Sequence, residues 1–553
     1  DDESEDEDMD YDAIIERLNA GNQVMTDSVQ KRLCKGGGVL KLITARLETM
    51  AGDPAARALH RALLRDASRP YMVMLNEWLH HGSINDPHSE FLIQEHKSIK
   101  RERLEQDYTD EYWERRYTIS REGIPTQLEG VKEKVLLAGK YLNVVRECGG
   151  VDISKVVQDM PTTFDDNRFL DNVNNAYSHA NESLMQLLLT THSLPARLAS
   201  LKHYFFLNPS DYFSYFMELG ASELKKNVKD ANTGKLQSLL DLVLRQPGSI
   251  VALDPFKEDV KVEMNSVPFI KSLQRVVNIT GIEQGEALQP LASQQPSEKD
   301  GDATGYTSLQ LDYSVPFPVS LVIGRKTIWR YQALFRYLLS LRHLESKLST
   351  TWHTQTRGIS WANRSRNRDL EIWKRRAWTL RARMLIFVQQ LLYFCTAEVI
   401  EPNWNKFVAR LNPEDGEQQS STSGTTRTVD ELMQDHVDFL DTCLKECMLT
   451  NSKLLRIHSK LMQSCELFAR YTGWLSRELE GTDPDLSSGN KPDTMTADQW
   501  RRFQATTSRH NAPTSGDAKT RISNLADIIQ KWETNFSRHL QILLDALNHY
   551  AAT

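Results

Sequence analysis

The sequence predicts an all-α protein, an elongated array of helical bundles in two modules. Apolar residues recur through most of the chain with the three-and-four spacing that places them on one face of a helix. Strand signals are scarce. The best is residues 314–323, where Pro316 and Pro318 lack the amide that a central strand must donate. We expect at most an edge strand or an extended lead-in there.

The first expected helices lie in the N-terminal module. An apolar helix runs through Met72 and Leu79 and stops at Gly82, just before the Asp86-Pro87 break. A second amphipathic helix covers residues 135–149, and the glycine that follows Cys148 is expected to end it. The segment 80–91 between them is therefore predicted to be a corner that starts a new element.

The later part of the chain carries longer helical stripes. The stripe from Trp373 to Val399 is expected to end at Pro402, because proline removes a backbone donor. At 1.5 Å per residue this helix would be about 40 Å long. A break is expected near Thr450 and Asn451. The other predicted helices cover residues 328–348, 429–448, 454–468 and 525–547.

Composition restricts the function. The net charge is −7, and nine of the first twelve residues are Asp or Glu, so residues 1–36 are expected to form an acidic, disordered start. The remaining chain is near neutral, which argues against a general nucleic-acid binder. Six cysteines without dense spacing fit a reducing, cytoplasmic compartment. No run approaches the roughly 18 apolar residues that a membrane span needs.

Length and ends set further expectations. A chain of 553 residues is long enough for about three or four compact units, or for an extended helical assembly. It opens on Asp1 rather than Met, so we expect a fragment of a longer subunit. Stretches rich in Ser, Gly, Pro and Gln are predicted to be polar insertions between helices. They cover residues 281–310, 412–427 and 481–519.

Catalytic and metal sites lack their sequence marks. The chain has no phosphate loop, dinucleotide fingerprint, nucleophile elbow or zinc-protease helix. A terpenoid synthase needs two acidic metal-binding motifs. The chain has partial matches that begin at Asp165-Asp166 and at Asn85-Asp86, and each lacks one of the acidic ligands that follow. A zinc site is conceivable because i and i+4 ligands on a helix can reach one ion, but packing is favoured, since the cysteines continue an apolar stripe. The residues concerned are His436, Cys443, Cys447, His458 and Cys465. We therefore expect no cofactor, no metal and no enzyme activity.

Two basic segments are candidate binding surfaces. Residues 357–383 carry nine cations against two acids, which attracts an acidic partner unless the charges only solvate a helix face. Residues 324–337, GRKTIWRYQALFRY, combine cations with aromatic side chains, the mixture that interface centres favour. An ordinary amphipathic helix with a basic exposed side is the alternative. The candidate binding residues are Arg325, Lys326, Trp329, Arg330, Arg336 and Tyr337.

Several stretches, taken together in their order, carry a family resemblance. The most informative is GKYLNVVRECG at residues 139–149. The others are DPHSEF at 86–91, YWERRYTI at 112–119, YFFLNPSDYFSYFMEL at 204–219, FPVSLVIGRKTIWRYQALFRYL at 317–338 and FLDTCLKECMLTN at 439–451. The chain resembles the gamma-tubulin complex proteins, specifically the component two type, from about Gly37 to beyond residue 470.

The resemblance implies a division of labour between the modules. It places lateral contacts between subunits in the N-terminal module, residues 37–250, and gamma-tubulin binding in the C-terminal module, residues 251–553. The boundary is expected near Gln246 to Asp254. Trp78, Asp86 and Glu90 are candidates for the lateral surface, or for the turn that supports it.

The implied function is that of a non-catalytic scaffold. By resemblance the chain binds gamma-tubulin, pairs laterally with component three and joins other subunits of the complex to template microtubule nucleation. This activity belongs at a microtubule-organising centre, that is, a spindle pole body or centrosome, in the cytoplasm. The residues alone leave a second class open, an unrelated helical scaffold or tethering-complex subunit with the same composition and helical periods.

Overall fold

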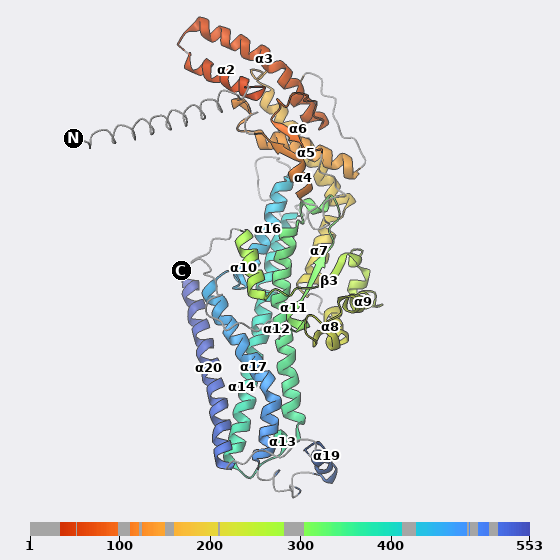
Figure 1. Cartoon of the computed structure of the whole chain (residues 1–553), viewed down its shortest axis with the longest axis vertical. Coiled ribbons are helices and arrows are strands. Elements are labelled where there is room, and N and C mark those ends of the chain that lie inside the picture. Colours follow the sequence, from red (N-terminus) through yellow and green to blue (C-terminus); the bar gives the residue numbers. More distant parts are fainter. Residues whose placement is uncertain are drawn as a thin grey trace, which may run out of the picture. The chain divides into compact units, whose positions relative to one another are not determined.

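The computed structural model shows a largely helical chain (Figure 1), which confirms the all-α class. Residues 1–33 of the predicted acidic start at 1–36 lie outside the described residues, as do most of the three predicted insertions. The structure describes residues 34–50, 52–97, 111–120, 124–149, 160–207, 211–280, 304–411, 427–483, 486, 491, 496–507 and 518–552.

The chain divides into two compact units, as the two-module prediction requires. The first unit holds Asp1–Ser193 together with two short later segments, Phe317–Leu321 and Ser423–Val429. The second unit holds the rest of the chain. The division therefore falls at Ser193, and not near residue 250.

Side-chain contacts explain why residues 194–250 belong to the second unit. Arg197 on α7 (Leu194–Phe205) pairs with Asp259 at 2.6 Å, and Ser200 donates to Asp254 at 2.6 Å. Gln237 on α9 (Thr233–Leu244) accepts from the backbone amide of Val262 at 2.6 Å. The glycine and proline of residues 246–255 therefore mark a turn inside a unit rather than a linker.

The first unit is built around three helices that contact one another, α3, α5 and α6, and it contains a two-stranded sheet. Asp53 caps the start of α3 by accepting from the amides of Ala55 and Ala56, and Gly82 ends it in the left-handed conformation at φ 63°. Strands β1 and β2 pair antiparallel. The elements are α2 (Gly37–Thr49), α3 (Pro54–His81), β1 (Ile93–Glu95), α4 (Glu111–Arg116), β2 (Tyr117–Ile119), η4 (Thr126–Leu128), α5 (Lys132–Gly149), α6 (Phe169–Gln186) and the π-helix η5 (Leu187–Thr191).

A four-helix bundle dominates the second unit. In it α12 (Arg325–Arg357) and α20 (Ala518–Ala552) each pack against both α14 (Arg368–Tyr393) and α17 (Ser452–Thr482), as Figure 1 shows. The stripe predicted on α12 is buried, including Leu334, Leu338, Leu341 and Leu348. Helices α12, α17 and α20 are each longer than the apolar stripe predicted for them, because the polar end turns are held by packing rather than by their own propensity.

Shorter elements surround this bundle. Strands β3 (Val260–Met264) and β4 (Leu309–Tyr313) pair antiparallel, and β4 packs against α12. The remaining elements of this unit are α8 (Asp211–Leu224), η6 (Ile250–Leu253), η7 (Lys257–Asp259), α10 (Phe269–Thr280), α11 (Gly305–Ser308), α13 (Ile359–Ala362), the π-helix η10 (Phe394–Ile400), α15 (Glu401–Leu411), α16 (Val429–Glu446) and α19 (Ala497–Thr507). The short helix η9 (Val319–Leu321) belongs to the first unit.

Three local predictions need correction. The strand lies at 309–313, just before the segment that was expected to be extended, because the prolines at 316 and 318 cannot continue the pairing. The stretches 281–310 and 481–519 are not wholly polar loops, since β4 and α19 begin inside them. The helix of α14 passes through Pro402 into α15, because the wider turns of η10 come before the proline and leave room for its ring.

One helix meets the length and composition of a membrane span. Among the described residues it is Arg368–Leu411, which joins α14, η10 and α15. The inner side of α14 packs in the bundle, where Trp373, Leu380 and Val388 are buried. A core helix of this kind passes the same test, so the finding is weak evidence for a membrane span.

Candidate functional site

The stretch 139–149 lies on α5 and owes its glycine to a close approach. A Cβ atom at Gly139 would lie 2.1 Å from Cε2 of Trp78, which is fully buried on α3. The Trp78 indole donates to the carbonyl of Val135 at 2.7 Å, so the ring is fixed against α5. Only glycine permits α3 and α5 to approach this closely at that point.

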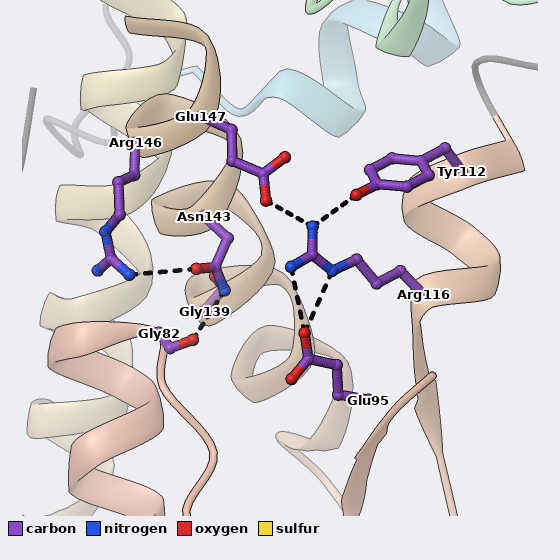
Figure 2. A network of polar contacts seen from close by, with 8 residues as sticks. All are labelled: Gly82, Glu95, Tyr112, Arg116, Gly139, Asn143, Arg146 and Glu147. Atoms are coloured by element: carbon purple, nitrogen blue, oxygen red, sulfur yellow. Dashed lines mark hydrogen bonds and ion pairs between the residues drawn. The ribbon is translucent and has the colours of Figure 1, made fainter. Parts of the chain in front are cut away.

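The polar residues of the same stretch fasten the end of α3. Asn143 donates through Nδ2 to the carbonyls of Gly82 at 2.8 Å and Gly139 at 3.0 Å (Figure 2). Arg146 donates to the carbonyl of His81 and to Oδ1 of Asn143. The last carbonyls of α3 are therefore satisfied by side chains of α5.

Arg116 is the centre of the ion-pair network in Figure 2. Its guanidinium reaches Oε1 of Glu95 on β1 at 3.1 Å, Oε1 of Glu147 on α5 and the hydroxyl of Tyr112 at 2.6 Å. It also lies over the ring of Tyr117 at 5.2 Å from the centroid. Burial alone lowers the pKa of this guanidinium, but Tyr117 and Glu147 more than offset that effect and raise it. Arg116 therefore joins β1, α4 and α5.

The predicted lateral residues support a corner of the first unit. Asp86 accepts from the amides of His88 at 3.2 Å and Phe91 at 2.7 Å, which holds the turn after α3. Glu90 is half-buried, and its carbonyl accepts from the amide of Gly37 at 3.5 Å. Trp78 is a core residue. These positions match the supporting turn that the sequence left open as the alternative to a contact surface.

At the start of α12, three of the six candidate residues reach the surface of the second unit. Lys326 is exposed. Arg325 pairs with Asp312 on β4 through Oδ1, and Trp329 is half-buried under the guanidinium of Arg275 on α10, at 4.8 Å from the ring centroid. These residues bring cations from α10 and α12 together beside one indole.

The other three candidates are interior residues. Arg330 is 6 % exposed and pairs with Asp441 on α16 at 2.7 Å. Arg336 is 5 % exposed and donates to the carbonyls of Val267 and Thr307, and burial lowers its pKa to about 10. Tyr337 contacts His458 through its hydroxyl at 3.4 Å. In this structure these side chains anchor α12, so the expectation that they form part of a binding surface needs correction.

The histidines and cysteines considered for zinc are packed in the core of the second unit. His436 bonds to the hydroxyl of Tyr331 at 2.8 Å and stacks on Phe407, and burial lowers its pKa to about 4. Burial likewise lowers the pKa of His458 to about 4 and raises that of the Cys465 thiol to about 12. No group of three or more potential ligands that could hold a metal occurs within the described ranges.

Sequence models of one family match both units. The model described as Gamma tubulin complex component N-terminal matches residues 13–190, and the one described as Gamma tubulin complex component C-terminal matches residues 194–553. The chain belongs to the gamma-tubulin complex component family. The junction between the two matched regions falls at the same point as the division between the compact units.

Relatives within the gamma-tubulin complex component family identify the component 2 type. Spindle pole body component alp4 of Schizosaccharomyces pombe is 43 % identical over 98 % of this chain and 69 % of the relative. Gamma-tubulin complex component 2 of Mus musculus is 35 % identical over 96 % of this chain and 56 % of the relative. Gamma-tubulin complex component 3 of Homo sapiens is 23 % identical over 77 % and 42 %. The chain thus spans 69 % of the length of the first of these relatives and 56 % of the length of the second.

Sequence reasoning missed residues that organise this gamma-tubulin complex component. In the sequence Arg116 stands out only as part of the motif YWERRYTI, and its partners Glu95 and Glu147 lie 21 and 31 residues away. Asp441, the partner of Arg330, lies 111 residues away. Pairs this distant leave no periodic signal in one sequence. The signal that was available is an arginine on an apolar helix face, which requires an acid from another element.

Proposed function

We propose that this chain is a non-catalytic scaffold subunit that binds gamma-tubulin and pairs laterally with component three of the complex. The proposal places it with other gamma-tubulin complex subunits at a microtubule-organising centre. The observation that carries it is the match of both family models, one to each compact unit. Family membership also removes the reason to prefer an unrelated tethering subunit.

The proposed mechanism is assembly rather than chemistry. A subunit that holds one gamma-tubulin and joins its neighbours side by side arranges several gamma-tubulins in advance. The entropy of ordering the first tubulin layer is then already offset before a microtubule begins to grow. Any GTP in this process belongs to the bound tubulin.

We place the gamma-tubulin contact in the second unit and include the exposed start of α12. Lys326 is exposed there, and the side chain of Arg325 is only 17 % exposed beside Asp312. Tubulins are acidic proteins, so cations around the half-buried Trp329 offer a complementary surface. Arg330, Arg336 and Tyr337 support this surface from inside by fixing the orientation of α12.

We place the lateral contact in the first unit, near the corner that Asp86 holds. The support for this assignment is rigidity. The corner is fixed by hydrogen bonds from Asp86, and the end of α3 is fixed by Asn143 and Arg146. A subunit that sets the spacing of its neighbours needs such a defined edge, because a loose corner would not transmit a fixed register.

The gamma-tubulin assignment is tested by binding of purified gamma-tubulin to the complete chain. Changing Lys326→Glu together with Trp329→Ala is expected to weaken binding about tenfold at physiological salt, because a favourable charge and an aromatic contact are both lost. Lys531→Glu on α20, which changes an exposed lysine elsewhere, is the control. Reversal of Arg330 is unsuitable, since it would leave Asp441 facing a like charge inside the protein.

Three outcomes are separable. Weaker binding by the double variant alone supports the assignment. Unchanged binding by that variant removes the start of α12 from the interface but leaves the scaffold function standing. Failure of the intact chain to bind either gamma-tubulin or component three would overturn the proposed function itself.

A further inference from the structure

The outer face of α14 carries a second stripe that the described chain leaves open. Its positions alternate by four and three residues, the spacing of a helix that packs along another helix. The stripe includes large apolar side chains that are well exposed, with Ile372 at 47 %, Ile386 at 58 % and Tyr393 at 57 %. The full stripe is Arg368, Ile372, Arg375, Thr379, Ala382, Ile386, Gln389 and Tyr393.

This stripe is separate from the one that packs in the bundle. Trp373, Leu380 and Val388 face the interior and are at most 3 % exposed. A helix with apolar residues on two faces is normally covered on both. On α14 the side chains of Ile372, Ile386 and Tyr393 are nevertheless well exposed, so one of its two apolar faces is left uncovered by the described residues.

The neighbouring helices border the stripe without crossing it. On one flank Arg376 pairs with Glu533 of α20 at 2.7 Å, and Arg383 donates to Ser537 of the same helix. On the other, Gln389 donates to Glu345 of α12 at 3.1 Å. Arg376 and Arg383 lie beside the stripe, and Gln389 is the one stripe position that these contacts use, so Ile372 and Ile386 stay exposed.

The charge of the stripe is one-sided. Arg368 and Arg375 are exposed in its first half, and none of the eight stripe positions is acidic. The basic segment 357–383, which the sequence marked as a possible surface for an acidic partner, supplies these two cations. The face therefore has a basic end and an apolar end, separated by about three helical turns.

We propose that this face binds a single α-helix of a partner protein, with apolar residues at heptad spacing and acidic residues opposite Arg368 and Arg375. From Ile372 to Tyr393 the seam is three heptads, about 32 Å long at 1.5 Å per residue. Residues 325 and 326 belong to another helix of the bundle. The outer face of α14 is therefore a second surface, and binding of a helix there does not depend on where gamma-tubulin binds.

Two other occupants fit the face less well. A bilayer would have to accept the polar side chains of Arg375, Thr379 and Gln389 inside the apolar stretch, which hydrocarbon disfavours. A second copy of this chain, paired in parallel, would place Arg368 and Arg375 against the same residues of its partner. An acidic helix satisfies both ends of the seam, so charge complementarity selects it.

The test uses a synthetic 28-residue helix as the probe, with Leu at the a and d positions and Glu at the e and g positions. A matched peptide carries Lys in place of every Glu. Binding to the complete chain is measured by fluorescence anisotropy. The Glu peptide is expected to bind at least tenfold more tightly than the Lys peptide, and the difference should shrink as salt is raised.

Substitutions in the stripe of α14, called the seam, test whether the peptide binds there. Ile386→Ser with Tyr393→Ser is expected to weaken the Glu peptide at least tenfold, whereas Leu242→Ser, which alters an equally exposed leucine on α9, should leave it unchanged. Arg368→Glu with Arg375→Glu is expected to reverse the preference in favour of the Lys peptide. That gain of binding cannot arise from a misfolded variant.

Several results would overturn the proposal. They are equal peptide binding by the wild type and the seam variants, absence of binding, sedimentation of the chain with phosphatidylcholine and phosphatidylserine vesicles through this seam, and self-association that the seam variants abolish. Gamma-tubulin binding is expected to survive in the seam variants. Its loss would assign the face to gamma-tubulin and refute a separate helical partner.

Discussion

At the scale of single residues, two helical glycines illustrate how identical residues serve different purposes. Gly139 on α5 lies against the ring of Trp78, and no other side chain fits at that point. Gly473 on α17 is exposed, and a Cβ atom added there would meet nothing within 4 Å. The sequence predicts a helix at Gly139, within 135–149, and none at Gly473, which lies beyond the helix predicted at 454–468, so its patterns do not show which glycine is needed for packing. Only the neighbouring helix makes one of them indispensable.

The two glycines predict opposite effects of alanine. Gly139→Ala is expected to destabilise the first unit by about 1–3 kcal/mol, because the buried indole cannot move away without disturbing its bond to Val135. Gly473→Ala should stabilise the second unit by about 0.5–1 kcal/mol through helix propensity. Urea unfolding followed by tryptophan fluorescence and amide exchange in α5 and α17 measures both. Equal effects of the two substitutions would refute the close packing at Gly139.

Buried histidines predict sensitivity to acid. Burial lowers the pKa of His436 and His458 to about 4, from 6.5 for an exposed imidazole. Between pH 6.5 and 4 the unfolded chain binds more protons than the folded chain, so the free energy of unfolding falls as the pH falls. The slope is about 1.4 kcal/mol per pH unit for each imidazole, and the stability is fully present above about pH 6.5.

The measurement is urea unfolding of the second unit from pH 7.5 to pH 4.5. His458→Leu is expected to reduce the slope by the share of one imidazole, whatever its effect at pH 7.5, where both rings are neutral. A slope that does not change on this substitution would show that His458 is protonated equally in the folded and unfolded chain.

At the scale of elements, the segment that leads into α16 is held by hydrogen bonds from α6, a helix far away in the sequence. Asn181 on α6 donates to the carbonyl of Arg427 at 3.0 Å and accepts from the amide of Val429 at 2.8 Å. These bonds lie within the first compact unit, which includes Ser423–Val429. The predicted polar insertion at 412–427 therefore ends in a structural contact.

Deletions on either side of this contact should behave differently. Removing residues 412–422 is expected to leave the thermal midpoint within about 1 °C, since none of the described contacts is lost. Removing 412–429 should lower the stability of the first unit by about 1–3 kcal/mol, because Asn181 is left without partners in a buried position. Calorimetry compares the two deletions. A large loss from the shorter deletion would show that residues 412–422 pack against the protein.

At the scale of the whole molecule, the position of the unit boundary has a direct test. A chain that begins at Leu194 retains the Arg197–Asp259 pair and the bond from Gln237 to the amide of Val262. We expect it to unfold cooperatively. A chain that begins at Val251 loses α7, α8 and α9 and leaves Asp259 without Arg197, so it should unfold at lower urea or aggregate. Circular dichroism with size-exclusion chromatography makes the comparison, and equal stability of the two fragments would refute the boundary.

The sequence by itself determined the helical class, the helix-bearing segments and the family resemblance. Those properties rest on local periodicity and on ordered motifs, which one chain displays without its neighbours. The tertiary structure decided which side chains reach the surface. Arg330 and Arg336 look like the exposed Lys326 in sequence, yet partners 111 and 69 residues away hold them inside the protein.

The same distinction applies to the boundary and to α14. Residues 246–255 have the composition of a linker, but α7 contacts Asp254 among them and α9 contacts Val262 beyond them, so they lie inside the second unit. The stripe of α14 that includes Trp373 is buried because α12 and α20 pack on it, whereas the stripe that includes Ile372 and Ile386 is exposed. Periodicity defines the faces of a helix. Only its packing partners determine which face is left for another protein, because burial depends on contacts between segments far apart in the chain.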